Sequence, residues 1–187
     1  MFIETEATPN PDTLKFLPGR MLMDEGTANF TDVDAAKGSP LATALFGLAD
    51  VRGVFVGYDF VTVTKATESD WSVVKPAVLG TLMTFFASGA PVIDPAYLAS
   101  MGGQGDAEED AEIIAQIRQL LDEKIRPAVA QDGGDIVYHG FKEGVVYLQM
   151  QGACSGCPSS TITLKNGIEN LLKYYVPEVI DVRAVDL

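Results

Sequence analysis

Two cysteines, Cys154 and Cys157, are the residues of this sequence whose type and spacing could do chemistry. They lie in the segment Gly-Ala-Cys-Ser-Gly-Cys-Pro-Ser-Ser, residues 152–160. Two intervening residues let both thiolates converge on one metal centre, and the neighbouring glycines let the backbone wrap closely around it. Pro158 is typical of the first position of a helix, which would put Cys157 at a helix N-terminus, where the dipole favours anionic sulfur. The segment therefore predicts an iron or zinc site.

Two thiolates do not complete such a site, because [2Fe–2S] and [4Fe–4S] clusters and structural zinc each take four protein ligands. The chain has no third cysteine and a single histidine, His139. A two-fold dimer is the economical solution, since Cys154 and Cys157 of both chains together supply four ligands around a shared centre. A site at such a subunit interface is more typical of a cluster that is transferred to another protein than of a cluster that is kept for electron transfer.

The same residues leave other interpretations open. A thioredoxin-like dithiol oxidoreductase carries this motif between a strand and a helix, although no aromatic residue precedes Cys154 here. A zinc-linked structural dimer and two purely structural cysteines are the remaining alternatives. The sequence contains no Ser-His-Asp set, phosphate-binding loop or paired-carboxylate motif, and His139 falls within a predicted strand. We therefore expect a binding protein and not an enzyme.

The acidic charge of the chain limits its partners. The net charge is −13, and residues 1–100 and 101–187 carry −6 and −7 of it. Such a surface repels phosphate backbones and anionic lipid, so we expect neither nucleic acid nor membrane partners. The first residues lack the basic flank and apolar stretch of a secretory signal. Two cysteines are too few for a disulfide framework, which favours a reducing compartment: a bacterial-type cytoplasm, or the mitochondrial matrix if a presequence has been removed.

The first half of the chain predicts a small α/β unit. Strands are expected over 2–7 and 13–17, and a β-hairpin over 53–64 around a Gly-Tyr-Asp turn. Ser39 and Pro40 predict the start of a short helix over 41–48. A longer helix is expected over 71–87, with Phe85 and Phe86 in its buried stripe and Pro76 disturbing its first turn or kinking it.

The second half predicts another small unit after a change in composition. Residues 88–107 show little periodicity and are rich in glycine, which is typical of a linker. A helix with a buried isoleucine and leucine stripe follows and is expected to end or bend at Pro127. A hairpin, the cysteine loop, a helix over 158–175 and a last strand over 179–185 complete an α-β-β-α-β order. We thus predict an α+β protein with domains over 1–88 and 107–187, joined by a flexible linker over 89–106.

Two sets of motifs carry a family resemblance. The segments Arg126–Ile136 and Gly152–Pro158, with their Asp-Gly-Gly-Asp and Cys-x-x-Cys motifs, resemble the C-terminal domain of the NifU family. The segments Glu4–Phe16, Gly53–Val56 and Phe85–Gly89 resemble the N-terminal domain of the Nfu scaffold proteins. Together the two regions cover nearly the whole chain apart from the linker.

The resemblance implies an iron–sulfur cluster scaffold or carrier. In it, Cys154 and Cys157 of two subunits would hold a [4Fe–4S] cluster, or alternatively a [2Fe–2S] cluster, across a homodimer interface. The implied partners are an upstream assembly scaffold and apo iron–sulfur client proteins, such as aconitase-like enzymes or lipoyl synthase. The N-terminal unit contains no cysteine, so we expect it to recognise partners or to shield the site. Functions tied to the extra cysteine-bearing modules of longer NifU proteins do not carry over.

Overall fold

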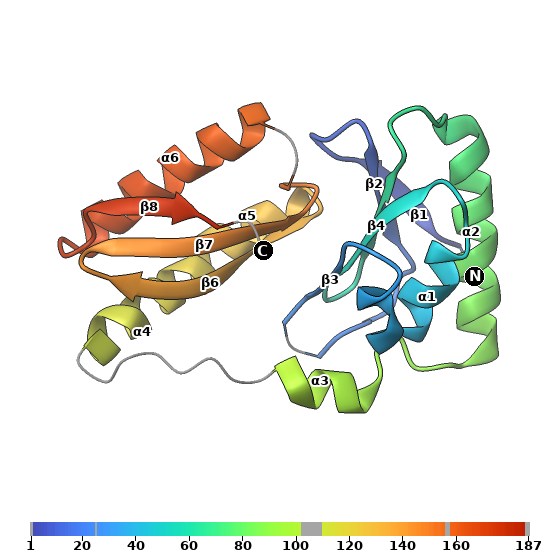
Figure 1. The fold of residues 1–187 in the computed structure, drawn as a ribbon, viewed down its shortest axis with the longest axis horizontal. Coiled ribbons are helices and arrows are strands. Elements are labelled where there is room, and N and C mark those ends of the chain that lie inside the picture. The colour runs from blue at the N-terminus through green and yellow to red at the C-terminus, as the bar shows by residue number, and fades with distance from the viewer. Residues whose placement is uncertain (1, 25, 102–109, 156–157, 186–187) are drawn as a thin grey trace. The chain divides into compact units, whose positions relative to one another are not determined.

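The computed structural model describes residues 2–24, 26–101, 110–155 and 158–185. The chain divides into two compact units, residues 1–103 and 104–187. The structure is mixed helix and strand throughout, which confirms the predicted α+β class (Figure 1). No helix in the described ranges combines the length and apolar character that crossing a membrane requires.

Unit 1 is built on a five-stranded antiparallel sheet in the order β1-β2-β5-β4-β3. Helices α1 and α2 cover one of its faces (Figure 1), and the core between them is apolar, with Phe16, Phe30 and Leu45 fully buried. The elements are β1 (Glu4–Ala7), β2 (Thr13–Leu17), β3 (Ala28–Phe30), a 3-10 turn (Ala35–Gly38), α1 (Pro40–Phe46), β4 (Val51–Val56), β5 (Val61–Lys65), α2 (Trp71–Ser88) and α3 (Pro95–Met101).

Local sequence chemistry explains most of these elements. The Ser39 hydroxyl accepts a hydrogen bond from the Ala42 N–H at 3.0 Å, so it caps α1 as predicted. Phe85 and Phe86 are each 8% exposed and lie in the core of unit 1. Helix α2 runs from Trp71 to Ser88 with the exposed Pro76 inside it, so the expected disturbance at this proline does not interrupt the helix.

The 3-10 turn, strand β3 and helix α3 of unit 1 were not predicted. Strand β3 has three residues, too few to show a period, and it forms by pairing with β4. Helix α3 falls inside the range expected to be linker. It is held by the Tyr97 ring, which lies 5.9 Å from the Phe30 ring, and by the Asp94 N–H, which donates to the Gly38 carbonyl at 2.9 Å. The domain limits at 88 and 107 remain a prediction.

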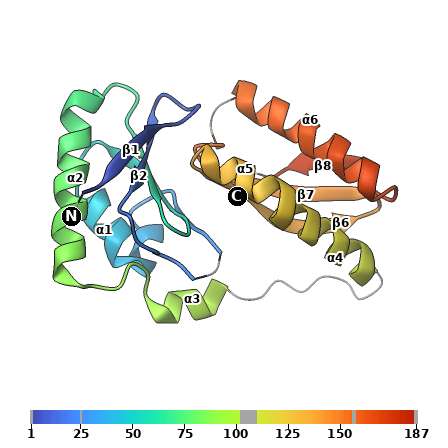
Figure 2. The same cartoon turned by 180° about the vertical axis from the view of Figure 1, so that it is seen from behind.

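Unit 2 has the predicted α-β-β-α-β order on a three-stranded sheet, β6-β7-β8. Strands β6 and β7 are antiparallel, whereas β8 returns parallel to β7 after α6. The helices lie on one face of the sheet (Figure 2), and their apolar residues share one core with the strands. The elements are α4 (Ala111–Leu120), a π-helical turn (Leu121–Ile125), α5 (Arg126–Gln131), β6 (Gly134–Lys142), β7 (Val145–Gly152), α6 (Pro158–Tyr175) and β8 (Asp181–Ala184).

Pro127 does not end the first helical run of unit 2. Proline cannot donate a backbone hydrogen bond to the residue four positions earlier. The chain widens into the π-helical turn Leu121–Ile125 just before Pro127 and then resumes as α5, with Pro127 in its first turn. The helix therefore continues to Gln131, where the Asp-Gly-Gly-Asp turn begins.

Candidate metal centre

Cys154 lies in the loop that joins β7 to α6. Its side chain is 7% exposed and packs with the core of unit 2. The Cys154 carbonyl accepts a hydrogen bond from the Thr161 hydroxyl at 3.2 Å, which ties the cysteine to the first turns of α6. Cys157 lies outside the described residues. The convergence of the two thiols therefore stays a prediction.

Gly134, the first residue of β6, lies against the Cys154 sulfur. A Cβ atom at position 134 would lie 2.5 Å from Cys154 Sγ and 2.8 Å from the Gln151 carbonyl oxygen. Both distances are far inside van der Waals contact, so only glycine fits without moving the sulfur or the β7 backbone. Strand register pairs Gly134 with Gly152. This pairing brings the Asp-Gly-Gly-Asp turn and the cysteine loop together at the end of the hairpin opposite its turn.

The backbone that leads into Cys154 is held in a tight turn. Gly152 has a φ of 66°, in the left-handed region that glycine tolerates best. Its carbonyl accepts hydrogen bonds from the Ser155 N–H at 3.1 Å and the Ser155 hydroxyl at 2.8 Å. The Ala153 N–H donates to the Gly133 carbonyl at 3.2 Å, which crosses to the turn before β6. Residues 152–155 are thus held to both ends of the hairpin strands by hydrogen bonds.

An ion pair beside the loop anchors the Asp-Gly-Gly-Asp turn. Asp135 is 3% exposed, and Arg126 Nε and Nη2 donate to its two carboxylate oxygens at 2.9 and 2.8 Å. Arg126 Nη1 also donates to the exposed Asp122 at 3.0 Å. The hydrogen bond to Asp135 raises the pKa of Arg126 above its ordinary value, so the guanidinium remains charged. The pair fastens α5 to the strand that begins with Gly134.

The Asp-Gly-Gly-Asp turn supports the cysteine loop directly. The structure shows the contact itself, through Gly134. It also shows that Arg126 holds the turn, a role that no spacing rule predicted. His139 is bonded across the hairpin, with Nε2 at 2.9 Å from Gln149 Oε1. Among the described residues, no group of three or more His, Cys, Asp or Glu side chains is arranged to hold a metal ion.

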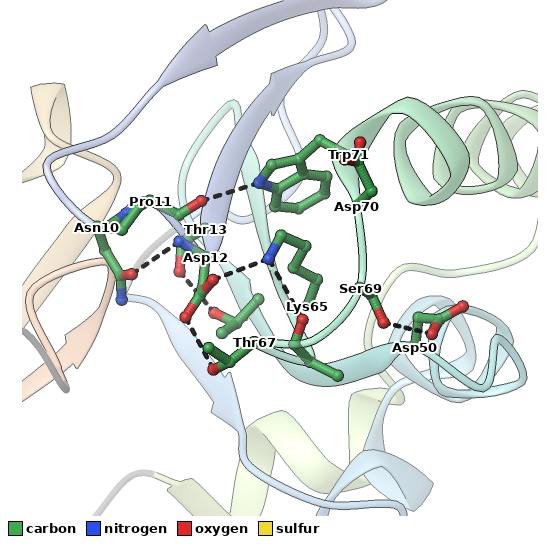
Figure 3. Close-up of polar contacts among 12 residues, drawn as sticks. Asn10, Pro11, Asp12, Thr13, Asp50, Lys65, Thr67, Ser69, Asp70 and Trp71 are labelled. Atoms are coloured by element: carbon green, nitrogen blue, oxygen red, sulfur yellow. Dashed lines mark hydrogen bonds and ion pairs between the residues drawn. The ribbon is translucent and has the colours of Figure 1, made fainter.

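A second polar cluster lies in unit 1, around the turn after β1 (Figure 3). Lys65, 7% exposed, donates to Asp12 Oδ1 at 2.8 Å, and Thr67 donates to Asp12 Oδ2 at 3.0 Å. The hydrogen bond from Lys65 is the main reason why the pKa of Asp12 is lowered. Trp71 Nε1 donates to the Pro11 carbonyl at 2.9 Å, and the indole packs against the core. These contacts lock the turn to β5 and α2, so the cluster stabilises the fold.

Two family models match the chain in the regions that the two units occupy. The model described as "NifU-like domain" matches residues 117–183, and "Scaffold protein Nfu/NifU N terminal" matches residues 3–89.

Relatives that match nearly the whole of this chain carry names of the same family. The chain is 50% identical over 186 residues to the human "NFU1 iron-sulfur cluster scaffold homolog, mitochondrial", covering 99% of this chain and 72% of that protein. It is 49% identical over 181 residues to the Arabidopsis thaliana "NifU-like protein 4, mitochondrial", covering 96% of this chain and 64% of that protein. A solution structure of a NifU-like protein from Saccharomyces cerevisiae matches with 32% identity and a TM-score of 0.44, over 51% of this chain and 86% of that one.

Proposed function

The chain belongs to the NifU-like and Nfu family of scaffold proteins, and from this premise we propose that it carries an iron–sulfur cluster as cargo. Cys154 and Cys157 of two copies hold a [4Fe–4S] cluster between them, and the holoprotein passes it to apo-proteins. The observation that carries the proposal is the prearranged loop around Cys154, in a chain whose only two cysteines are the pair 154 and 157. Two thiolates per chain require a second chain for four ligands.

The loop suits a cysteine that must bind the cluster and later release it. Cys154 is positioned by backbone hydrogen bonds and by the Gly134 contact, so little ordering is needed when it binds iron. Each subunit supplies only two sulfur–iron bonds. A client's thiolates can replace them one at a time, each new sulfur–iron bond forming as a carrier bond breaks, with no net transfer of electrons. The proposed role is that of a carrier and not of an enzyme.

The partners and the compartment follow from the same premise. The cluster donor is an upstream assembly scaffold, and the acceptors are apo iron–sulfur proteins. The human and Arabidopsis relatives are named as mitochondrial proteins, which supports the mitochondrial matrix over the bacterial-type cytoplasm. The chain covers 72% and 64% of the lengths of these two relatives.

Anaerobic reconstitution tests the proposal. The apoprotein is incubated with iron, sulfide and thiol, and iron and sulfide are measured per chain together with the mass in solution. We expect two irons and two sulfides per chain, one [4Fe–4S] Mössbauer signature, and a dimer that reverts to monomer when the cluster is chelated, because ligation energy is also association energy. A complete cluster on each monomer would overturn the shared site. A colourless dimer that forms with zinc alone, or a dithiol that only exchanges disulfides, would establish one of the two alternative functions.

A further inference from the structure

A groove in unit 1 is lined by residues of β1 and of α2. Its volume is about 560 Å³, and one wall is the continuous run of residues 2–6. The other wall is formed by Lys75 and Leu79, which are one helical turn apart on α2. The exposed ring of Phe2 stands at one end, 81% accessible to solvent. The groove therefore has the form of a strand edge facing a helix.

The β1 edge is able to accept another strand. β1 stands at the end of the strand order, and within the described part of the chain it pairs with β2 alone. In an antiparallel pair, alternate residues direct their N–H and C=O groups away from the partner strand. Residues 4–6 of β1 line the groove, and outward-directed groups of this kind can bond to an extended peptide, which is a common way for proteins to recognise peptides.

The side chains of β1 set the chemistry of that peptide. Ile3 points into the core, on the same side as α2, and is 7% exposed. Glu4 and Glu6 are exposed, and Glu6 meets Lys15 of β2 at 3.5 Å on the other face of the sheet. Because side chains alternate along a strand, an added strand would direct every second side chain toward Leu79. The side chains between them would lie beside the two glutamates.

We propose that this groove binds an extended segment of a partner protein in which apolar residues alternate with Lys or Arg, added as a further strand next to β1. A second copy of this chain is the poorer occupant. Pairing β1 with itself across a two-fold axis would bring Glu4 and Glu6 against the same acidic residues, and like charges opposite each other destabilise a sheet. The proposal concerns a unit without cysteine, so it holds or fails separately from cluster binding.

The test uses the apo full-length chain and two synthetic peptides, blocked at both ends. One alternates valine with lysine and the other alternates valine with glutamate. Amide NMR shifts are followed up to millimolar peptide. We expect the lysine peptide to perturb residues 3–7 and 75–79 in a saturable way and the glutamate peptide to leave them unchanged. The same lysine peptide, N-methylated at alternate nitrogens so that it cannot donate to β1, should not bind.

Two matched charge-reversal variants distinguish binding in the groove from non-specific attraction of a basic peptide to an acidic protein. Glu4→Lys changes a glutamate beside the groove, whereas Glu68→Lys changes another exposed glutamate of unit 1 that does not line it. We expect Glu4→Lys to weaken binding of the lysine peptide by about three- to thirtyfold, as cross-strand charge pairs imply. We expect Glu68→Lys to change the binding of the same peptide by less than about twofold. Equal weakening by both variants, perturbed amides away from the groove, unimpaired binding of the methylated peptide, or no binding at millimolar concentration would each overturn the proposal.

Discussion

Gly134→Ala is the sharpest test of how the structure supports the cysteine loop. The added methyl group would sit 2.5 Å from Cys154 Sγ, 3.1 Å from Cys154 Cβ and 2.8 Å from the Gln151 carbonyl oxygen. Favourable contacts between such atoms begin near about 3.5–4.0 Å, so the neighbours must retreat by about 1 Å. The Gln151 oxygen belongs to a strand paired along its whole length, from Gly134↔Gly152 to Lys142↔Val145. The sulfur is therefore the atom that must move most.

Inserting a methyl group into a filled site typically costs about 1–3 kcal/mol. We expect Gly134→Ala to lower the free energy of unfolding of unit 2 by this amount. In a domain of 60–100 residues, each kcal/mol lowers Tm by roughly 4–8 °C. Displacement of Sγ should also reduce the iron bound after reconstitution. Gly140→Ala is the matched control, because it lies on the same strand and its Cβ would meet nothing within 4 Å. We expect it to change stability by at most about 0.5 kcal/mol.

The assay uses the single tryptophan of the chain. Trp71 lies in unit 1, so its fluorescence reports the unfolding of that unit alone, whereas far-UV circular dichroism reports both. Urea titrations followed by both probes separate the two transitions, which a single two-state fit would not. The Trp71 transition should be the same in the wild type and both variants. The proposed role of the contact between Gly134 and Cys154 is refuted if Gly134→Ala and Gly140→Ala give the same urea midpoint for unit 2 and the same iron content.

Three further predictions concern named side chains. Cys157→Ser removes two of the four proposed ligands at once, because the symmetry of the dimer applies the change twice. We expect the variant to lose both its bound iron and the metal-dependent dimer, with an unchanged circular dichroism spectrum. A variant that keeps a full cluster would contradict the ligand assignment. Arg126→Gln leaves the carboxylate of Asp135 nearly buried without its bidentate partner and should lower unit 2 stability by about 1–3 kcal/mol in urea unfolding. The pKa of Asp12 is lowered chiefly by the hydrogen bond from Lys65, so its contribution to unit 1 stability is present above the unfolded pKa of about 3.9 and lost as pH falls through the folded pKa. The gap in Trp71-detected unfolding free energy between wild type and Asp12→Asn should therefore be full at pH 6 and close as the pH falls below about 4, and a gap that stays constant would exclude this linkage.

Short-range patterns in the sequence determined most of the elements. The cap at Ser39, the apolar stripe that includes Phe85 and Phe86, and the β-branched runs of the hairpin depend on neighbours within one or two turns. The same is true of the Cys-x-x-Cys motif, whose chemistry depends on two residues three positions apart. The helices and strands were predictable because local spacing sets their periodicity. The convergence of the two thiols on one metal follows from local spacing too and stays a prediction.

Tertiary structure alone decided what surrounds those features. Strand β3 exists because β4 pairs with it, and α3 is held by Tyr97 against Phe30. The contact of Gly134 with Cys154 depends on the register of β6 and β7, and the groove beside β1 depends on the packing of α2 next to that strand. Residues far apart in sequence meet only once strand register and helix packing are fixed. Both are set by the free energy of the whole core and not by local sequence. The sequence therefore determined which atoms could bind a metal, whereas the fold determined which residues hold Cys154 in place.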